Sequence, residues 1–423
     1  MPNAISPMDF TASIFKIVRD EGPSQALNWL EEYLSTGPLD ANNYRILQAR
    51  SQIADAEKQI ERFSEQEKNS GNNTIRQVIA RPFDPRVTMG LPSAFWPTSE
   101  DGLYQTRVLT NPVSIGFNTD HLSDFDKSRF AGANFGDAPT RTFDDQVYVA
   151  SSAQVSYTGW SEATLVSGSN EYHPARSGRL ARLTGRALLR EPKREVELAY
   201  VLPFPYVANN YYHSLTEMAY GLRHIHLVPE HTPIIFDLDP YGLLPVLCRY
   251  LNIDPDRLIA RSDVSDALIV KAILPGVGPY YWSSGLKSFF RAAAMVQPES
   301  DSSADKIYVS RSKSSRSLPS ENVIEQAMRS AGLRIIHAED YGFSEQMAIF
   351  REARLIVTSH GAGLANLAFV SDTARVVEIF LDELLNRDFQ RRSQFVTRDY
   401  RALFYEGNDP APLIEELRRF VNL

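Results

Sequence analysis

The feature that most constrains the fold is an alternation of short apolar runs with segments of helical spacing that begins near residue 232. Strands that alternate with helices form parallel sheets whose faces the helices cover. We therefore predict an α/β fold with two doubly wound, Rossmann-like lobes that face a cleft. The predicted strands are 232–236, 257–259, 267–270, 306–310, 333–336, 355–358 and 375–379. The predicted helices are 242–251, 284–295, 320–331, 344–352 and 362–369.

The pattern upstream of this alternation is less regular. Alternating side chains predict strands at 146–150, 153–157 and 195–201, and a helix is expected over 212–227. Residues 81–142 are rich in Pro, Gly, Asp and Asn, which is typical of loops and short elements.

The length of the chain indicates more than one domain. A chain of 423 residues exceeds what a single hydrophobic core usually organises. A polar stretch at 298–305 separates two cycles of strands and helices. The predicted division is an N-terminal helical extension at 1–75, an N-terminal α/β lobe at 76–297 and a C-terminal α/β lobe at 298–423.

The extension contains an apolar pattern with a seven-residue period. Leu39, Ile46, Ile53 and Ile60 recur at the spacing of a coiled-coil seam. A homodimer formed through residues 39–63 and a helix docked on the chain's own body are both compatible with this pattern.

Charge and cysteine usage exclude some classes of protein. Lys and Arg number 44 against 52 Asp and Glu, a formal net charge of −8, which argues against a dedicated nucleic-acid binder. The single cysteine, Cys248, cannot form an internal disulfide and suits a reducing compartment. Residues 1–11 lack the pattern of a secretion signal, and no stretch approaches the ~20 apolar residues of a membrane span. We expect a cytoplasmic protein, with peripheral contact at the inner face of a membrane left open.

The sharpest local motif is Ser-His-Gly-Ala-Gly, which follows the predicted strand 355–358. Glycines in a strand-to-helix turn permit close backbone approach, and the free N–H groups of the following helix suit an anion such as a diphosphate. A tight turn without a ligand is the alternative. The candidate binding residues are His360, Gly361, Ala362, Gly363 and Asn366.

A basic segment, 310–316, follows the first strand of the predicted C-terminal lobe. The guanidinium groups of Arg311 and Arg316 can each bind two phosphate oxygens. A solvated surface loop is the alternative interpretation.

The order of these segments resembles glycosyltransferase family 61, which includes plant, animal and bacterial enzymes. The resemblance covers roughly residues 200–400. Its segments are 308–311 with Arg316, 331–333, 341–346 with Phe350, 353–357, 360–364 with Asn366 and Phe369, and 377–379; upstream of them, 210–215 with Glu217 resembles the family's motif of an asparagine, two aromatics and a histidine.

Two positions depart from the family pattern. The family often has an Asn-Glu pair soon after the second arginine, where this chain has 317–322, so we assign Glu321 no catalytic role. The threonine common before the motif asparagine is Ala365 here.

The resemblance implies an inverting transfer on a GT-B scaffold, from a nucleotide-sugar donor to a glycan acceptor, without a metal or other cofactor. Its motifs place Asn210 and Tyr212 on the acceptor side and the arginines, the glycine turn, His360 and Asn366 on the donor side. Glu378, at the end of the last predicted strand, is expected to accept hydrogen bonds from ribose. A soluble acidic chain of this kind suggests bacterial cell-surface polysaccharide synthesis, with an acceptor that can be lipid-linked.

Such a reaction needs a base for the acceptor hydroxyl. His213 is our first candidate and Glu217 the second, because four residues of spacing place both on one helical face. Glu345 is the third, although its position also suits a helix cap.

Two other functions remain open. The chain could be a non-catalytic sugar-nucleotide-binding or scaffolding subunit. Asp237 and Asp239 form a DxD after a strand, which could instead indicate a metal-dependent enzyme, and Asp239 stands beside an ordinary turn at 240–242.

Overall fold

The structure is a computed structural model that describes the chain most fully from residue 186 onward. The described residues are 25, 28, 58, 73–77, 79–82, 105–108, 113–115, 141–143, 146–155, 165–167, 170–173, 186–205, 210–275, 284–314, 317–381, 389, 390, 393, 396, 397, 399–405, 407 and 409–421. Almost all of the predicted helical extension, including the heptad positions between 39 and 63, lies outside them, as does Arg316.

The C-terminal unit is built on a five-stranded sheet in which every pairing is parallel, as predicted. The strand order is β15-β14-β16-β17-β18. The strands are β14 (Lys306–Val309), β15 (Arg334–Ile336), β16 (Leu355–Ser359), β17 (Arg375–Leu381) and β18 (Asp399–Tyr405).

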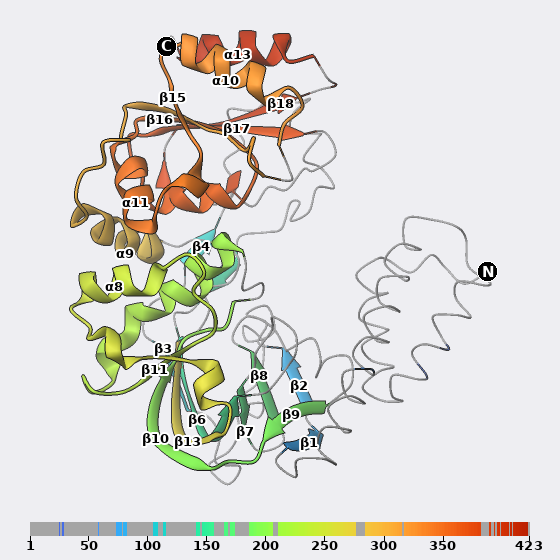
Figure 1. Cartoon of the computed structure of the whole chain (residues 1–423), viewed down its shortest axis with the longest axis vertical. Helices are drawn as coiled ribbons and strands as arrows, with labels where there is room; N and C mark the ends of the chain where they lie inside the picture. Colours follow the sequence, from blue (N-terminus) through green and yellow to red (C-terminus); the bar gives the residue numbers. More distant parts are fainter. Residues whose placement is uncertain are drawn as a thin grey trace.

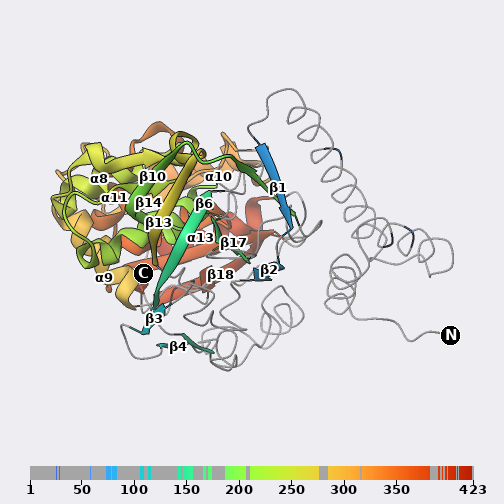
Figure 2. The same ribbon diagram turned by 90° about the horizontal axis from the view of Figure 1, so that it is seen from below.

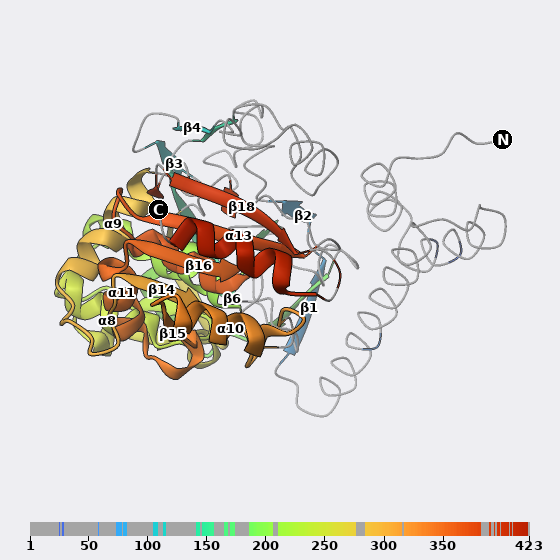
Figure 3. The same cartoon turned by 90° about the horizontal axis from the view of Figure 1, so that it is seen from above.

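Helices cover both faces of this sheet (Figures 1 and 3). Successive strand residues point to opposite faces, so Val357 packs with α10 and α13 while Ile356 packs with α11 and η7. The helices are α10 (Glu321–Ser330), α11 (Phe343–Glu352), the 3₁₀ helix η7 (Ala362–Phe369) and α13 (Ala411–Val421). The helix predicted over 362–369 is a 3₁₀ helix. β18 and α13 were not predicted.

The other large sheet has nine strands and mixed directions, so only its parallel part has the strand order of the doubly wound sheet that we predicted. Its order is β12-β11-β10-β13-β6-β7-β8-β2, with β3 also paired to β6. Only the β12-β11-β10-β13 part and the β2–β8 pair are parallel; β6 runs antiparallel to β13, and the two lie side by side with β10 in Figure 2. Helical segments separate β10, β11, β12 and β13 along the chain. Shorter connections join β6, β7 and β8, and such connections favour antiparallel pairing. The strands are β2 (Ile79–Pro82), β3 (Gln105–Val108), β6 (Gln146–Val155), β7 (Leu165–Ser167), β8 (Asn170–His173), β10 (Arg194–Val201), β11 (Ile234–Phe236), β12 (Leu258–Ala260) and β13 (Ala267–Pro275).

Two antiparallel pairs complete the described strands. They are β1 (Asn73–Gln77) with β9 (Arg186–Arg190), and β4 (Val113–Ile115) with β5 (Arg141–Phe143). The strands predicted at 146–150 and 153–157 are one strand, β6, with Ser152 at a positive φ of 52° inside it.

The helix predicted over 212–227 is present but irregular. It consists of α7 (Tyr211–His213), the π-helical η2 (Ser214–Met218) and the 3₁₀ helix η3 (Ala219–Leu227). The Tyr200 hydroxyl donates to the Gly221 carbonyl at 2.6 Å, and a Cβ at Gly221 would lie 2.7 Å from Cδ of Pro203. η3 is therefore packed tightly against the end of β10 and the residues after it, and one of its carbonyls accepts a hydrogen bond from the Tyr200 side chain.

The two units share one hydrophobic core. It joins residues after β10 and in α8 (Leu243–Leu251) with residues of α11, η7 and the inner face of the C-terminal sheet. Between the units lies α9 (Ser284–Met295), where Phe290 contacts Phe369 of η7 with ring centroids 5.8 Å apart.

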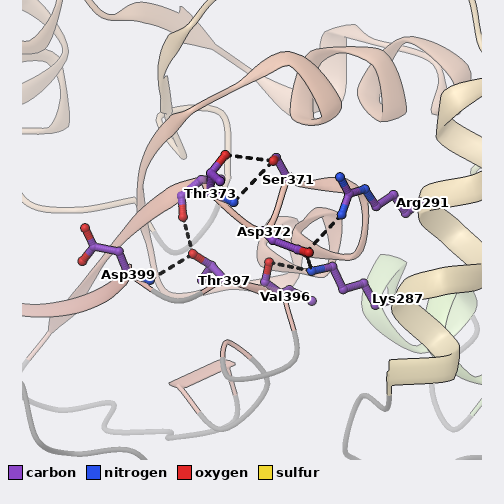
Figure 4. A network of polar contacts seen from close by, with 9 residues as sticks. Lys287, Arg291, Ser371, Asp372, Thr373, Val396, Thr397 and Asp399 are labelled. Carbon is purple, nitrogen blue, oxygen red and sulfur yellow. Dashed lines mark hydrogen bonds and ion pairs between the residues drawn. The ribbon is translucent and has the colours of Figure 1, made fainter.

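Polar contacts also fasten α9 to the C-terminal unit (Figure 4). Lys287 and Arg291 both pair with Asp372, and Lys287 donates to the Val396 carbonyl at 3.1 Å. The predicted division at 297/298 thus separates α9 from part of its packing surface. In the described part of the chain, no helix combines the length and apolar character needed to cross a membrane.

Candidate active site

The strand order of the C-terminal sheet identifies where a ligand would bind. With the strands numbered along the chain, the order is 2-1-3-4-5, and the direction of winding reverses between β14 and β16. Ligands of open α/β sheets bind outside the carboxyl ends of the strands at such a reversal. Arg311 follows β14 and His360 follows β16, so both predicted binding residues lie at this point.

His360 is held by a buried carboxylate on the neighbouring strand. Its Nδ1 lies 2.6 Å from Oε1 of Glu378 in β17, and the other carboxylate oxygen accepts a hydrogen bond from the hydroxyl of Tyr400 in β18. The His360 ring also stacks on Phe380, with an interplanar angle of 25°. Three parallel strands therefore fix the position of one imidazole.

The predicted ribose contact of Glu378 meets a geometric obstacle. The side chain is 0% exposed, and both of its oxygens already accept hydrogen bonds. A direct contact with a ligand would require His360 or Tyr400 to move. The carboxylate acts on the site through His360.

Arg311 lies against the glycine turn. Its Nη1 donates to the His360 carbonyl, and a Cβ at Gly361 would lie 2.6 Å from Cζ of Arg311. A side chain at this position would therefore displace the end of the Arg311 side chain. The Arg311 backbone N–H in turn donates to Glu321, 3.2 Å away.

Glu321 organises the loop that carries Arg311. Its buried carboxylate accepts from the Tyr308 hydroxyl at 2.7 Å and from the Leu318 N–H at 2.9 Å. Burial and the nearby Glu321 raise the pKa of Tyr308 well above its usual value, so the hydroxyl remains a donor. These contacts give Glu321 a structural role, and we assign it no catalytic role.

His213 and Glu217 form the predicted pair in the unit that contains the nine-stranded sheet. His213 Nδ1 lies 2.7 Å from Glu217 Oε1, and the side chains are 14% and 7% exposed. Asn210 begins the helix by accepting from the N–H groups of Tyr212 and His213. A π-helical turn, η2, follows His213, and such turns occur often at functional sites.

Aromatic and polar contacts bring the two histidines into one region. Phe389 contacts the His360 ring at 5.6 Å and the Tyr212 ring at 5.7 Å, measured between centroids. Tyr211 donates to Asn366 Oδ1 at 2.5 Å, and Asn366 donates to Gln346 at 2.9 Å. The segment that carries His213 is therefore joined to the segment after His360.

Residues 211–377 match the family model Glycosyltransferase 61. The matched range begins at α7 and ends in β17, one residue before Glu378, so it contains both histidines. The match supports the predicted family and a glycosyltransferase activity. A search of curated proteins finds no match.

Asn366, a motif residue of the Glycosyltransferase 61 resemblance, is fully buried. Its amide is engaged by Tyr211 and Gln346, and Gln346 also donates to the carbonyls of Ala338 and Tyr341. Of the two predicted roles for Asn366, support of the turn fits these contacts, whereas a nucleotide contact would displace one of them. Burial raises the pKa of Tyr211 far above its usual value, which keeps its hydroxyl protonated.

Glu345 lies at the start of α11. Its Oε2 accepts from the Gly342 N–H at 3.1 Å, which is the one half of a capping box that a glycine at the N-cap allows. The capping alternative is therefore confirmed for Glu345, and its use as a base stays a prediction that no contact here favours.

The DxD segment has local structural partners. Asp239 accepts from the N–H groups of Leu243 and Leu244 at 2.9 Å and so caps α8, while Asp237 pairs with Arg261. Desolvation raises the pKa of both carboxyls, against the opposing effect of these partners. Within the described residues, no group of three or more His, Cys, Asp or Glu side chains is arranged to hold a metal ion.

Several residues of the site were not found by sequence reasoning: Tyr211, Gln346, Phe389 and Tyr400. Tyr211 and Gln346 stand inside motifs already singled out, so their positions were available but not their roles. Tyr400 lies in β18, where apolar and aromatic residues over 399–405 would have indicated a strand.

Proposed function

We propose that this chain is an inverting glycosyltransferase that moves a sugar from a nucleotide-sugar donor to a glycan acceptor. The observation that carries the proposal is the meeting of Arg311 and His360 at the winding reversal of the C-terminal sheet, with His213 joined to the same region through Tyr212 and Phe389. The family match supports the transferase class.

Arg311 and the first N–H groups of η7 are the donor side in this proposal. They would bind the diphosphate and stabilise the negative charge that develops on the departing nucleoside diphosphate. Arg316 is a second cation for this role in the proposal, by its place in the sequence. Asn366 supports the glycine turn through its contacts with Tyr211 and Gln346.

His213 is the proposed base. Glu217 contacts Nδ1, and in this proposal Nε2 is the nitrogen that takes the proton of the acceptor hydroxyl. The acceptor oxygen forms a bond to the anomeric carbon while the bond from that carbon to the diphosphate oxygen breaks. A single displacement of this kind inverts the configuration at the anomeric carbon.

We further propose that the two units act as the halves of a GT-B enzyme and that arginine, with no metal ion, offsets the charge of the leaving group. A cytoplasmic location at the inner face of a membrane, a lipid-linked acceptor and a role in bacterial cell-surface polysaccharide synthesis complete the proposal. The acidic charge and the single cysteine, which suits a reducing compartment, support this setting.

A thermal-shift screen against UDP, GDP, CMP, their sugar conjugates and ATP, with and without chelator, tests this function. A ligand at ~100 times its Kd raises the unfolding free energy by about 2.7 kcal/mol. We expect a chelator-resistant shift with one nucleotide class, and donor hydrolysis or transfer that His213→Ala lowers about 10²- to 10⁴-fold. Shifts with none of these nucleotides would contradict the proposal and favour a scaffolding subunit.

A further inference from the structure

The Glu378 carboxylate is saturated by protein groups, and His360 is the member of this cluster that reaches outward. Glu378 is 0% exposed and Tyr400 6%, whereas the His360 side chain is 14% exposed. Among the residues that the structure describes, Nε2 of His360 has no hydrogen-bond partner. This nitrogen is therefore the group that the cluster offers to a ligand.

The hydrogen bonds of Glu378 determine which ring nitrogen carries the proton. Tyr400 can only donate to the carboxylate while its hydroxyl is protonated, and the carboxylate can only accept from Nδ1. A neutral His360 is then the Nδ1–H tautomer, and its Nε2 is an acceptor.

Packing fixes the plane of the His360 ring, in addition to the tautomer that Glu378 sets. Phe380 stacks on His360 with centroids 5.6 Å apart, and Phe389 packs at 60° to the ring. The His360 backbone N–H donates to Ile379, next to Glu378 on β17, at 2.9 Å. Rotation that would exchange the two nitrogens would break the contact with Glu378.

We propose that Glu378, whose carboxylate also accepts from Tyr400, is a positioning residue that holds His360 in the Nδ1–H tautomer, so that Nε2 accepts a hydrogen bond from a hydroxyl group of the bound sugar nucleotide. The inference rests on the proposed function for its ligand. It gives His360 the hydroxyl contact that the sequence suggested for Glu378, and Tyr400 lies beyond the family match.

The neighbouring arginine supports this choice of ligand chemistry. Arg311 donates to the carbonyl of His360 itself, so a cation and a hydrogen-bond acceptor lie close together at the carboxyl ends of β14 and β16. A nucleotide sugar carries its diphosphate between two sugars that both bear hydroxyl groups. A diphosphate at Arg311 would therefore bring either the ribose or the transferred sugar to Nε2.

The first experiment measures the tautomer directly. The ring ¹⁵N shifts of histidine-labelled protein, at alkaline pH where histidine is neutral, should show a protonated Nδ1 for His360 in the native chain. Glu378→Gln should move these shifts toward a mixture of tautomers, because an amide can donate as well as accept a hydrogen bond. Glu217→Gln is the matched control, because it makes the same change in the other histidine–carboxylate pair and should leave the His360 shifts unchanged.

A second experiment measures the use of Nε2 by ligand hydroxyls. His360→Asn keeps a donor for Glu378 but has no Nε2. We compare the Kd of UDP and GDP with those of their 2′-deoxy and 3′-deoxy analogues, and of the sugar conjugates with their deoxy-sugar analogues. Loss of the contacted hydroxyl should weaken binding about two- to tenfold in the native chain, and that factor should vanish in His360→Asn.

The two sets of analogues distinguish the ribose from the transferred sugar. A hydroxyl effect that persists at full size in His360→Asn would overturn the ligand part, and His360 shifts that are the same in the native chain and in Glu378→Gln would overturn the positioning part. Should Glu378→Gln fail to fold, the native chain still tests the tautomer, because a protonated Nε2 in neutral His360 would overturn the positioning part. If no nucleotide binds, the proposed function fails, and the ¹⁵N shifts alone decide the role of Glu378.

Discussion

The two histidine–carboxylate pairs of this chain have nearly the same geometry and opposite origins. His213 and Glu217 lie 2.7 Å apart, His360 and Glu378 lie 2.6 Å apart, and each histidine side chain is 14% exposed. The first pair comes from one helical segment, four residues apart. The second spans 18 residues and joins the ends of two parallel strands.

This difference shows that local and tertiary structure can build the same chemical unit. The backbone hydrogen bonds of α7 and η2 keep the first pair together, whereas the second depends on the register of β16, β17 and β18. The first pair is therefore readable from spacing, and the second requires the folded sheet. We also expect the two to differ in how they fail when altered.

The largest expected effect separates the pairs by function. His213→Ala should lower turnover about 10²- to 10⁴-fold with little change in nucleotide affinity, which is the range for loss of a general base. His360→Ala should instead weaken nucleotide binding. Steady-state kinetics together with nucleotide titration checks both variants. Equal effects of the two variants on turnover and on affinity would break the comparison.

The second prediction concerns stability. Glu378→Ala leaves the Tyr400 hydroxyl and His360 Nδ1–H without their acceptor in a buried site, at about 1–3 kcal/mol for each donor. Glu217→Ala should cost less, because its helix still holds His213 in place. Chemical denaturation of both variants measures the difference. A larger loss for Glu217→Ala would show that the helical pair is the more structural one.

The third prediction tests the close approach beside His360. Gly361→Ala places a methyl group against the Arg311 guanidinium and should displace it. Loss of one charge-assisted contact of about 1.5–3 kcal/mol would weaken nucleoside diphosphate binding roughly ten- to hundredfold. Gly342→Ala is the control, since a Cβ there makes only an ordinary contact, 3.7 Å from Oε2 of Glu345. Similar titration curves for the two variants would argue against the role of Arg311.

The smallest effect is expected at the link between the two pairs. Tyr211→Phe removes the donor to Asn366 Oδ1 and leaves a buried acceptor unsatisfied, at a cost of about 1–3 kcal/mol in unfolding free energy. Because His213 follows Tyr211 by two residues, turnover should fall more than nucleotide affinity. Thermal melting and kinetics measure the two effects, and a variant with unchanged melting would indicate that the bond contributes nothing.

The success of sequence reasoning follows the same division between local and tertiary structure. Buried strands of the C-terminal sheet, such as β16, were predicted from their apolar runs, and the His213–Glu217 pair was predicted from helical spacing. The mixed sheet was not predicted, because periodicity shows that a strand exists but does not show its direction. The partnership of His360 with Glu378 and Tyr400 depends on strand order, which no local pattern in the chain contains.

The core that α9 shares between the units has a practical consequence for dividing this chain into pieces. A fragment that begins at residue 298 would lose Phe290, Lys287 and Arg291, and with them the cover over Phe369 and the partners of Asp372. Apolar side chains on α11 and η7 that now pack against α9 would face water. A fragment that begins at residue 284 keeps this helix and is the better candidate for independent expression.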